Sequence, residues 1–289
     1  MAYDGVRAEG AALTRVIACC GMTWTRYLGI DYSGAATADT RLPGLRVWSA
    51  DAVGDREMRP EVNPERHWTR RNLWEFLDRT LSEPEPTIIG IDHGLSFPEA
   101  WFARHRASED WSAFLEEIAD AWPTDAPEVR VDDVRVGAVG SGASLVGDTR
   151  WRRRCEVACP GTKSVFHFDV QGSVAKSTHA GLPWIRRLRR AHRNLHIWPF
   201  DGIDPPRSAS VLCEAFPTLF RDDYPAPTLT PDQRDARAVA LWLRDMGAQG
   251  RLREQFRNAV EGVPIPTLKL EGWIIGLAVP QATASKAPR

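Results

Sequence analysis

Four carboxylates occupy comparable places in the 289-residue chain, and their chemistry suggests the first hypothesis. Asp31, Asp92 and Glu214 each stand at the end of a short apolar run typical of a buried strand. Asp235 stands one turn before Val239, on the inward face of an expected helix. Because the carboxyl ends of strands line the ligand crevice in α/β sheets, we expect the four side chains to converge.

Carboxylates gathered in this way require positive charge. Burial disfavours their ionised forms, and neighbouring carboxylates repel one another. Hard cations take oxygen ligands, and a pair of ions ~3.5 to 4 Å apart stabilises the attacking and leaving oxygens of phosphodiester hydrolysis. We therefore predict that Asp31, Asp92, Glu214 and Asp235 bind Mg²⁺ or Mn²⁺ and form the catalytic site.

Each acid also has a structural explanation. An Asp after a strand often caps a turn or a helix, and Asp235 suits the first turn of a helix through the helix dipole. Glu214 would pair equally well with an arginine such as Arg207 or Arg221. These explanations stand beside the metal-site hypothesis.

The elements that would position these acids indicate an α/β domain. Apolar runs at 27–31 and 45–48 predict an antiparallel hairpin, and the run at 87–92 predicts a central strand covered on both faces. Asn63-Pro64 predicts the start of a helix. Apolar residues at helical spacing predict another helix after Pro231. Strands that alternate with helices are typical of a sheet flanked by helices.

Five short motifs in order resemble one known family. They are Gly29–Ala35, Gly90–Pro98, Cys213–Pro217, Asp235–Ala238 and Glu271–Trp273. The set resembles the family catalogued as domain of unknown function 429, which is regarded as predicted nucleases of the ribonuclease H-like fold. The resemblance runs from about residue 26 to 279 and so covers most of the chain.

The resemblance implies a mixed five-stranded sheet flanked by helices, with the first three strands antiparallel and the rest parallel. It also implies an acidic site with Asp31 on the first strand, Asp92 on the fourth, Glu214 on or after the fifth and Asp235 on the late helix. One departure is His93, which follows Asp92 where a small residue and a proline are expected. His93 is a candidate proton donor to a leaving oxygen, with a buried loop histidine as the alternative.

The near-neutral net charge hides an uneven distribution of basic and acidic residues along the chain. The chain has 37 basic and 38 acidic residues and a formal net charge of −1. The stretch 150–193 holds eleven Lys/Arg and two Asp/Glu, a net +9 that leaves the remainder at −10.

Such a stretch suits a phosphate backbone, with Trp151 and Trp184 available to stack on bases. We predict contacts with DNA or RNA from seven residues of this stretch. They are Arg150, Arg152, Arg153, Arg154, Lys176, Arg186 and Arg190. The alternative for 186–193 is a solvated helix face.

The chain is expected to form a single domain at 23–279 with an insertion at about 125–178, after an irregular extension at 1–22 and before a disordered tail at 280–289. Short strands are expected in the insertion near Val134 and at 165–170. No apolar run approaches the ~18 to 20 residues of a membrane span, so we predict no membrane partner and a cytoplasmic location. Protein partners are not predicted.

The function predicted from these features is metal-dependent hydrolysis of nucleic acid phosphodiester bonds. One alternative is an actin-like ATPase or phosphotransferase, because Gly-Ile-Asp-x-Ser-Gly at 29–34 resembles a phosphate-binding hairpin. Another is a non-catalytic module that binds nucleic acid or protein. No nucleophile elbow, P-loop or Rossmann fingerprint occurs. Cys155 and Cys159, with His167 and His179, fit no common zinc spacing.

Overall fold

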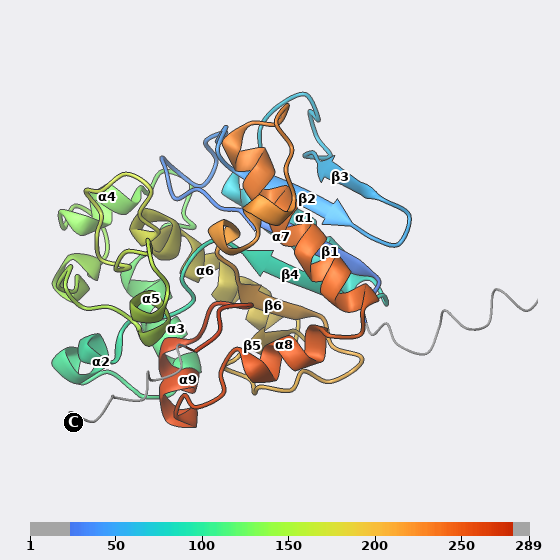
Figure 1. Ribbon diagram of the computed structural model, residues 1–289. Coiled ribbons are helices and arrows are strands. Elements are labelled where there is room, and N and C mark those ends of the chain that lie inside the picture. Colours follow the sequence, from blue (N-terminus) through green and yellow to red (C-terminus); the bar gives the residue numbers. More distant parts are fainter. Residues whose placement is uncertain (1–23, 280–289) are drawn as a thin grey trace, which may run out of the picture.

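Six strands form one mixed sheet with helices on both faces (Figure 1). The computed structural model describes residues 24–279. Its strands are β1 (Arg26–Asp31), β2 (Arg46–Ala50), β3 (Asp55–Met58), β4 (Thr87–Ile91), β5 (His196–Trp198) and β6 (Val211–Glu214). Their order across the sheet is β3-β2-β1-β4-β6-β5.

The directions of the strands agree with the predicted pattern, whereas their number does not. β2 runs antiparallel to β1 and β3, and β4, β6 and β5 all run parallel to β1. The prediction of five strands is wrong because the short β5 adds a sixth at the edge, where it pairs with β6 from His196↔Val211 to Trp198↔Cys213.

Helices of different lengths cover the sheet, and further helices lie beyond one side of it (Figure 1). They are α1 (Arg70–Ser82), α2 (Glu99–His105), α3 (Trp111–Ala121), α4 (Val131–Arg135), α5 (Arg154–Ala158), α6 (Ala175–Ala191), α7 (Pro231–Ala248), α8 (Leu252–Asn258) and α9 (Ile265–Glu271). Three short 3₁₀ helices are η1 (Gly142–Leu145), η2 (Pro217–Leu219) and η3 (Arg221–Asp223).

The sheet separates two hydrophobic clusters because alternate strand residues point to opposite faces. Leu28 and Ile89 belong to the cluster that includes α1, α3 and α6. Tyr27 and Ile88, each one residue earlier, belong to the cluster that includes α7 and α8. The central strands are therefore buried on both faces, as the run at 87–92 predicts.

Glycines let α7 lie directly on the central strands. A Cβ at Gly29 of β1 would stand 2.0 Å from the carbonyl oxygen of Ala236, and one at Gly90 of β4 would stand 2.5 Å from Val239. Further along the helix, Gly247 lies against the Tyr27 hydroxyl. The helix thus runs antiparallel to β1, and its first turn lies toward the carboxyl end of that strand.

Several expected elements differ from the structure. Asn63 does not start a helix, because it takes a left-handed turn conformation with φ of 59°. The helix begins at Arg70, where the Thr69 side chain accepts a hydrogen bond from the Asn72 backbone. Val134 lies in α4, and residues 165–170 form turns. These apolar residues pack into the core and do not pair with a strand.

The structure leaves two of the predictions untested. The extension predicted at 1–22 and the tail predicted at 280–289 lie outside the described residues. Across the described part of the chain, no helix has the length and apolar character that crossing a membrane requires.

The close contact between α7 and β1 predicts the effect of adding one methyl group. Gly29→Ala should lower the free energy of unfolding by about 1 to 3 kcal/mol, because the new Cβ overlaps the helix backbone. Gly54→Ala is the matched control, since no atom lies within 4 Å of the added methyl group. Urea unfolding of both variants checks this, and equal stabilities would contradict the contact.

Candidate active site

Three of the four predicted acids meet where β1 and β4 end. Asp31 is the last residue of β1, and the Asp92 backbone N–H donates to the Ile30 carbonyl at 2.9 Å, so the two acids lie on adjacent strand ends. α7 adds Asp235 and, one turn earlier, Asp232. The charges of Asp92, Asp232 and Asp235 all act to raise the pKa of Asp31.

Burial and mutual repulsion make the first two acids hard to ionise. Burial, followed by Asp92, Asp232 and Asp235, raises the pKa of Asp31 to about 9. Arg46, its antiparallel partner on β2, acts in the opposite direction. Burial, followed by the charges of Asp235 and Glu214, likewise raises the pKa of Asp92 to about 8.

Asp235 is also partly exposed and has a cation beside it. Its side chain is 20% exposed, and an Arg221 guanidinium nitrogen lies 3.4 Å from one carboxylate oxygen. Burial raises its pKa, while Arg221 opposes that effect. Arg221 of η3 therefore places one cation at the edge of the site.

Glu214 is not a free carboxylate beside the aspartates. Both of its oxygens accept hydrogen bonds from Arg153, each at 2.7 Å, and the Nε of Arg153 donates to Glu156 at 2.8 Å. The alternative of an arginine partner is thus the observed one, with Arg153 in place of Arg207 or Arg221. A buried carboxylate at this strand end requires such a partner.

Arg153 also differs from its predicted role. It is 1% exposed, so it lies in the interior and not on a surface that a phosphate backbone can reach. The preceding chain turns inward at this point, and Glu156 caps the start of α5 through the Arg153 backbone N–H. Arg153 therefore anchors the insertion to the end of β6.

Glu271, the last residue of α9, adds hydrogen bonds to the starts of α2 and α5. Its two carboxylate oxygens accept from the backbone N–H groups of Glu99 and Arg154, at 2.6 and 2.7 Å. The residue therefore holds the starts of α2 and α5 together.

His93 fits the alternative of a buried loop histidine. The ring is 1% exposed, packs edge-on against Tyr32 with centroids 4.7 Å apart, and lies under Gly181 of α6. Its Nδ1 is 2.8 Å from the Gly94 carbonyl oxygen. Burial lowers its pKa to about 4. The neutral ring is poorly suited to donate a proton at neutral pH.

The other predicted contacts to nucleic acid are largely balanced by nearby acids. Four pairs are Arg150–Asp148, Lys176–Asp132, Arg186–Asp120 and Arg190–Glu116. Arg152 donates to the Thr162 carbonyl at 3.0 Å, and Arg154 is exposed. The acids on α3 that face α6 favour the solvated-face interpretation of 186–193.

Sequence reasoning missed two residues of the site, Asp232 and Arg221. The signal for Asp232 is its spacing of three from Asp235, which places both acids on one face of a helix. The sequence suggests Arg221 only as a partner of Glu214. Its position beside Asp235 depends on the path of the chain from η2 into η3.

The arrangement offers oxygen ligands but no complete cage. Among residues 24–279, no group of three or more His, Cys, Asp or Glu side chains is placed to hold a metal ion. Mg²⁺ usually keeps several waters and binds through one or two carboxylates together with substrate phosphates. The donor chemistry of Asp31, Asp92 and Asp235 fits that mode of binding.

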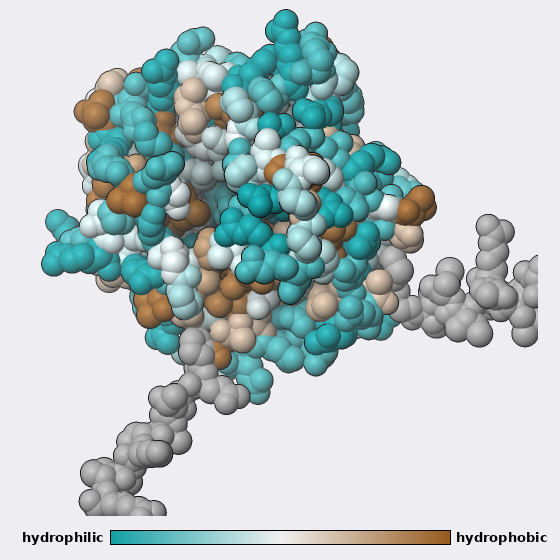
Figure 2. Space-filling view, turned by 45° about the horizontal axis from the view of Figure 1, so that its top comes forward, coloured by the Kyte–Doolittle hydropathy of each residue, from teal (hydrophilic) through white to brown (hydrophobic). Residues whose placement is uncertain are grey.

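A cavity of about 210 Å³ adjoins the aspartates. Asp92 and Glu214 line it, together with residues of the insertion and of the segment after β6. Figure 2 shows the molecule turned so that the top of Figure 1 comes forward, and hydrophilic side chains cover most of that face.

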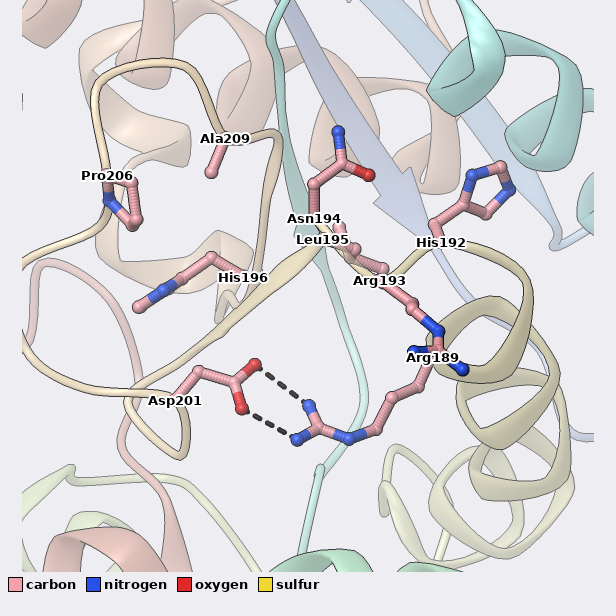
Figure 3. A pocket seen from close by; sticks show the side chains of 9 residues that line it. All are labelled: Arg189, His192, Arg193, Asn194, Leu195, His196, Asp201, Pro206 and Ala209. Carbon is pink, nitrogen blue, oxygen red and sulfur yellow. Dashed lines mark hydrogen bonds and ion pairs between the residues drawn. The ribbon is translucent and has the colours of Figure 1, made fainter.

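A larger hollow of about 450 Å³ lies at the other end of the strands, where β5 begins (Figure 3). Several of its charged groups are paired, whereas Arg193 is exposed to solvent. Arg189 and Asp201 form two bonds of 2.8 Å, and His192 is 2.8 Å from Asp78. The Asp201 carboxylate of this hollow is therefore already bonded to Arg189, and the hollow does not contain the cluster of aspartates found at the ends of β1 and β4.

Comparisons with known proteins add no assignment. No protein-family model matches the chain, and no significant match was found among curated proteins or among solved structures. The resemblance to the domain of unknown function 429 family stays a prediction.

The raised pKa values predict how stability depends on pH without metal. Because folding raises the pKa of Asp31 and Asp92 from the usual 3.8, the folded state binds more protons than the unfolded state between about pH 4 and about pH 9. Stability should therefore fall as pH rises through this window. Thermal unfolding in EDTA measures it.

Asp31→Asn should weaken this pH dependence and raise the melting temperature at about pH 8, since the variant has no charge to bury there. Glu128→Gln, at an exposed position, should keep the wild-type slope. A wild-type melting temperature that rises from about pH 6 to about pH 9 would contradict the raised pKa values.

The buried ion pair predicts a large loss of stability. Arg153→Met should lower the free energy of unfolding by about 3 to 5 kcal/mol, because Glu214 and Glu156 lose their buried partner. Arg150→Met removes an exposed pair and should change stability little. Comparable losses in the two variants, measured by urea unfolding, would argue against the network.

Proposed function

We propose that this protein is a divalent-metal-dependent nuclease with a ribonuclease H-like core. The observation that carries the proposal is the placement of Asp31 and Asp92 on adjacent strand ends, with Asp235 on the helix that packs against β1. The order of three antiparallel strands followed by parallel ones supports the fold assignment. A cytoplasmic location is part of the same proposal.

The carboxylates supply what Mg²⁺ or Mn²⁺ requires. A bound ion would stabilise negative charge on phosphoryl oxygens and lower the pKa of a water molecule. Asp31 and Asp92 would hold the ion, and Asp235 would complete the site. Without a cation, these two partly buried acids retain protons at neutral pH, so cation binding should displace protons.

The remaining residues position these ligands and the substrate. Arg153 neutralises Glu214, so that one fewer unpaired negative charge faces the phosphate. The Arg221 side chain is 37% exposed and can reach a phosphate oxygen at the rim. The sequence predicts instead that Glu214 binds metal and that Arg153 contacts nucleic acid at the surface.

The loop after β1 argues for this function over an actin-like ATPase or phosphotransferase. The Arg70 guanidinium, which is buried, donates to the carbonyl oxygens of Ala35 and Ala36, at 2.7 and 3.2 Å. Gly34 packs against the backbone of Lys176. The segment is therefore held by backbone contacts and is not an open phosphate-binding loop. The described residues also contain one such sheet, whereas the actin-like fold has two.

The proposal predicts that activity depends on Asp31. Wild-type protein with Mg²⁺ or Mn²⁺ should cleave at least one member of a panel of labelled single-stranded, duplex and branched DNA and RNA. The cleavage rate of Asp31→Asn should be more than about 100-fold lower than that of the wild type, because the substitution removes an anionic ligand. Glu128→Gln should retain it.

Two results would contradict the proposal. One is Mn²⁺-dependent cleavage by Asp31→Asn at the wild-type rate. The other is nucleic acid binding by the wild type with no turnover of any substrate, which would favour a non-catalytic binding module.

A further inference from the structure

The cavity beside Asp92 is placed and sized for one part of a substrate. It lies where β4 and β6 end, next to the acids of the proposed metal site. Its volume of about 210 Å³ is below the ~300 to 1,000 Å³ of sites for drug-sized ligands. It therefore has room for a single ring system and not for several nucleotides.

The floor of the cavity does not suit a phosphate. Arg153, Glu156 and Glu214 line it, and their charged atoms are already bonded to one another. Two carboxylates against one guanidinium leave the floor slightly negative. Such a floor repels an anion and accommodates a neutral group with hydrogen-bonding edges.

The walls of the cavity suit a flat aromatic group. Phe216 is half-buried, and Val174 and Ile274 add apolar surface. The backbone just before Phe216 is fixed to the sheet, because the Ala215 N–H donates to the Ile91 carbonyl at 2.9 Å. Thr162 adds a hydroxyl group to the lining, and Lys163 adds an ammonium group that donates to the Gln171 carbonyl at 2.7 Å. An aromatic side chain at such a place stacks on a base of any sequence.

We infer that this cavity receives one unpaired base next to the phosphate that is cleaved. The inference rests on the proposed nuclease function and specifies its substrate class. A paired base cannot enter so small a cavity, so the substrate is a single strand or a duplex that already carries an unpaired nucleotide. Continuous duplex is excluded as the preferred substrate.

Two variants of opposite kind test the cavity. Phe216→Ala removes the stacking partner, and Val174→Trp fills the space. Val62→Trp, at a position that is 71% exposed, is the control for the added ring. Circular dichroism and thermal unfolding establish which variants are folded, and either folded variant suffices for the test.

The binding probe is a single-stranded oligonucleotide with one 2-aminopurine, measured with Ca²⁺ in place of Mg²⁺. Its fluorescence should be quenched on binding to wild-type protein. Phe216→Ala and Val174→Trp should each bind about 10-fold more weakly and lose the quenching, whereas Val62→Trp should keep both.

The cleavage assay uses Mn²⁺ with a single strand, a full duplex and a single strand carrying one abasic nucleotide at the cleaved position. Wild-type kcat/KM should be about 10-fold or more higher on the single strand than on either other substrate. On the abasic strand, Phe216→Ala should equal the wild type, because the base that it would contact is missing.

The outcomes separate this inference from the proposed function. If duplex and abasic strands are cleaved as fast as the intact single strand, the inference that the cavity receives a base is overturned, and the nuclease proposal stands. Absence of cleavage with quenching that both variants abolish overturns the nuclease proposal and supports a base-binding cavity. Absence of both cleavage and quenching overturns both.

Discussion

The close contact of α7 with β1 and β4 is the constraint on which the site depends. Two strand glycines, Gly29 and Gly90, leave room for the helix backbone and for Val239. Any side chain at Gly29 would push the helix away and separate Asp235 from Asp31. The distance between helix and sheet therefore decides whether acids from two distant parts of the chain share one electrostatic environment.

The charge distribution has a different meaning once the chain is folded. The +9 stretch at 150–193 contributes a buried cation, Arg153, and several residues paired with acids on neighbouring helices. Its main observed role is to dock the insertion against the end of β6, through Glu156 and Glu214. The open face of the site is left to Arg221 and to the polar rim of the cavity.

These features together describe a site with separate compartments. Aspartates with raised pKa values form the anionic part, where a cation would bring a phosphate. The neighbouring cavity, with its internally paired floor and aromatic wall, provides space for a neutral ring. The ion pair between Arg153 and Glu214 gives the two parts their different character. It neutralises the Glu214 carboxylate, which would otherwise compete with the aspartates for a cation, and it neutralises the Arg153 guanidinium, which would otherwise attract an anion into the cavity.

Local patterns in the sequence were sufficient for the strands at 27–31, 87–92 and 211–214, for the helix after Pro231 and for the acids at their ends. Each of these depends on apolar periodicity or on a neighbouring turn, which are properties of adjacent residues. The edge strand β3 was missed, because its residues Asp55–Met58 are mostly polar and show no apolar run.

The sequence by itself determined which acids stand at strand ends and which helix follows them. Only the tertiary structure decided that Glu214 is bonded to Arg153, 61 residues earlier, and that His93 lies under α6. The physical reason is that the state of a charged or titratable side chain depends on burial and on its partner. Both are set by contacts between segments far apart in the chain.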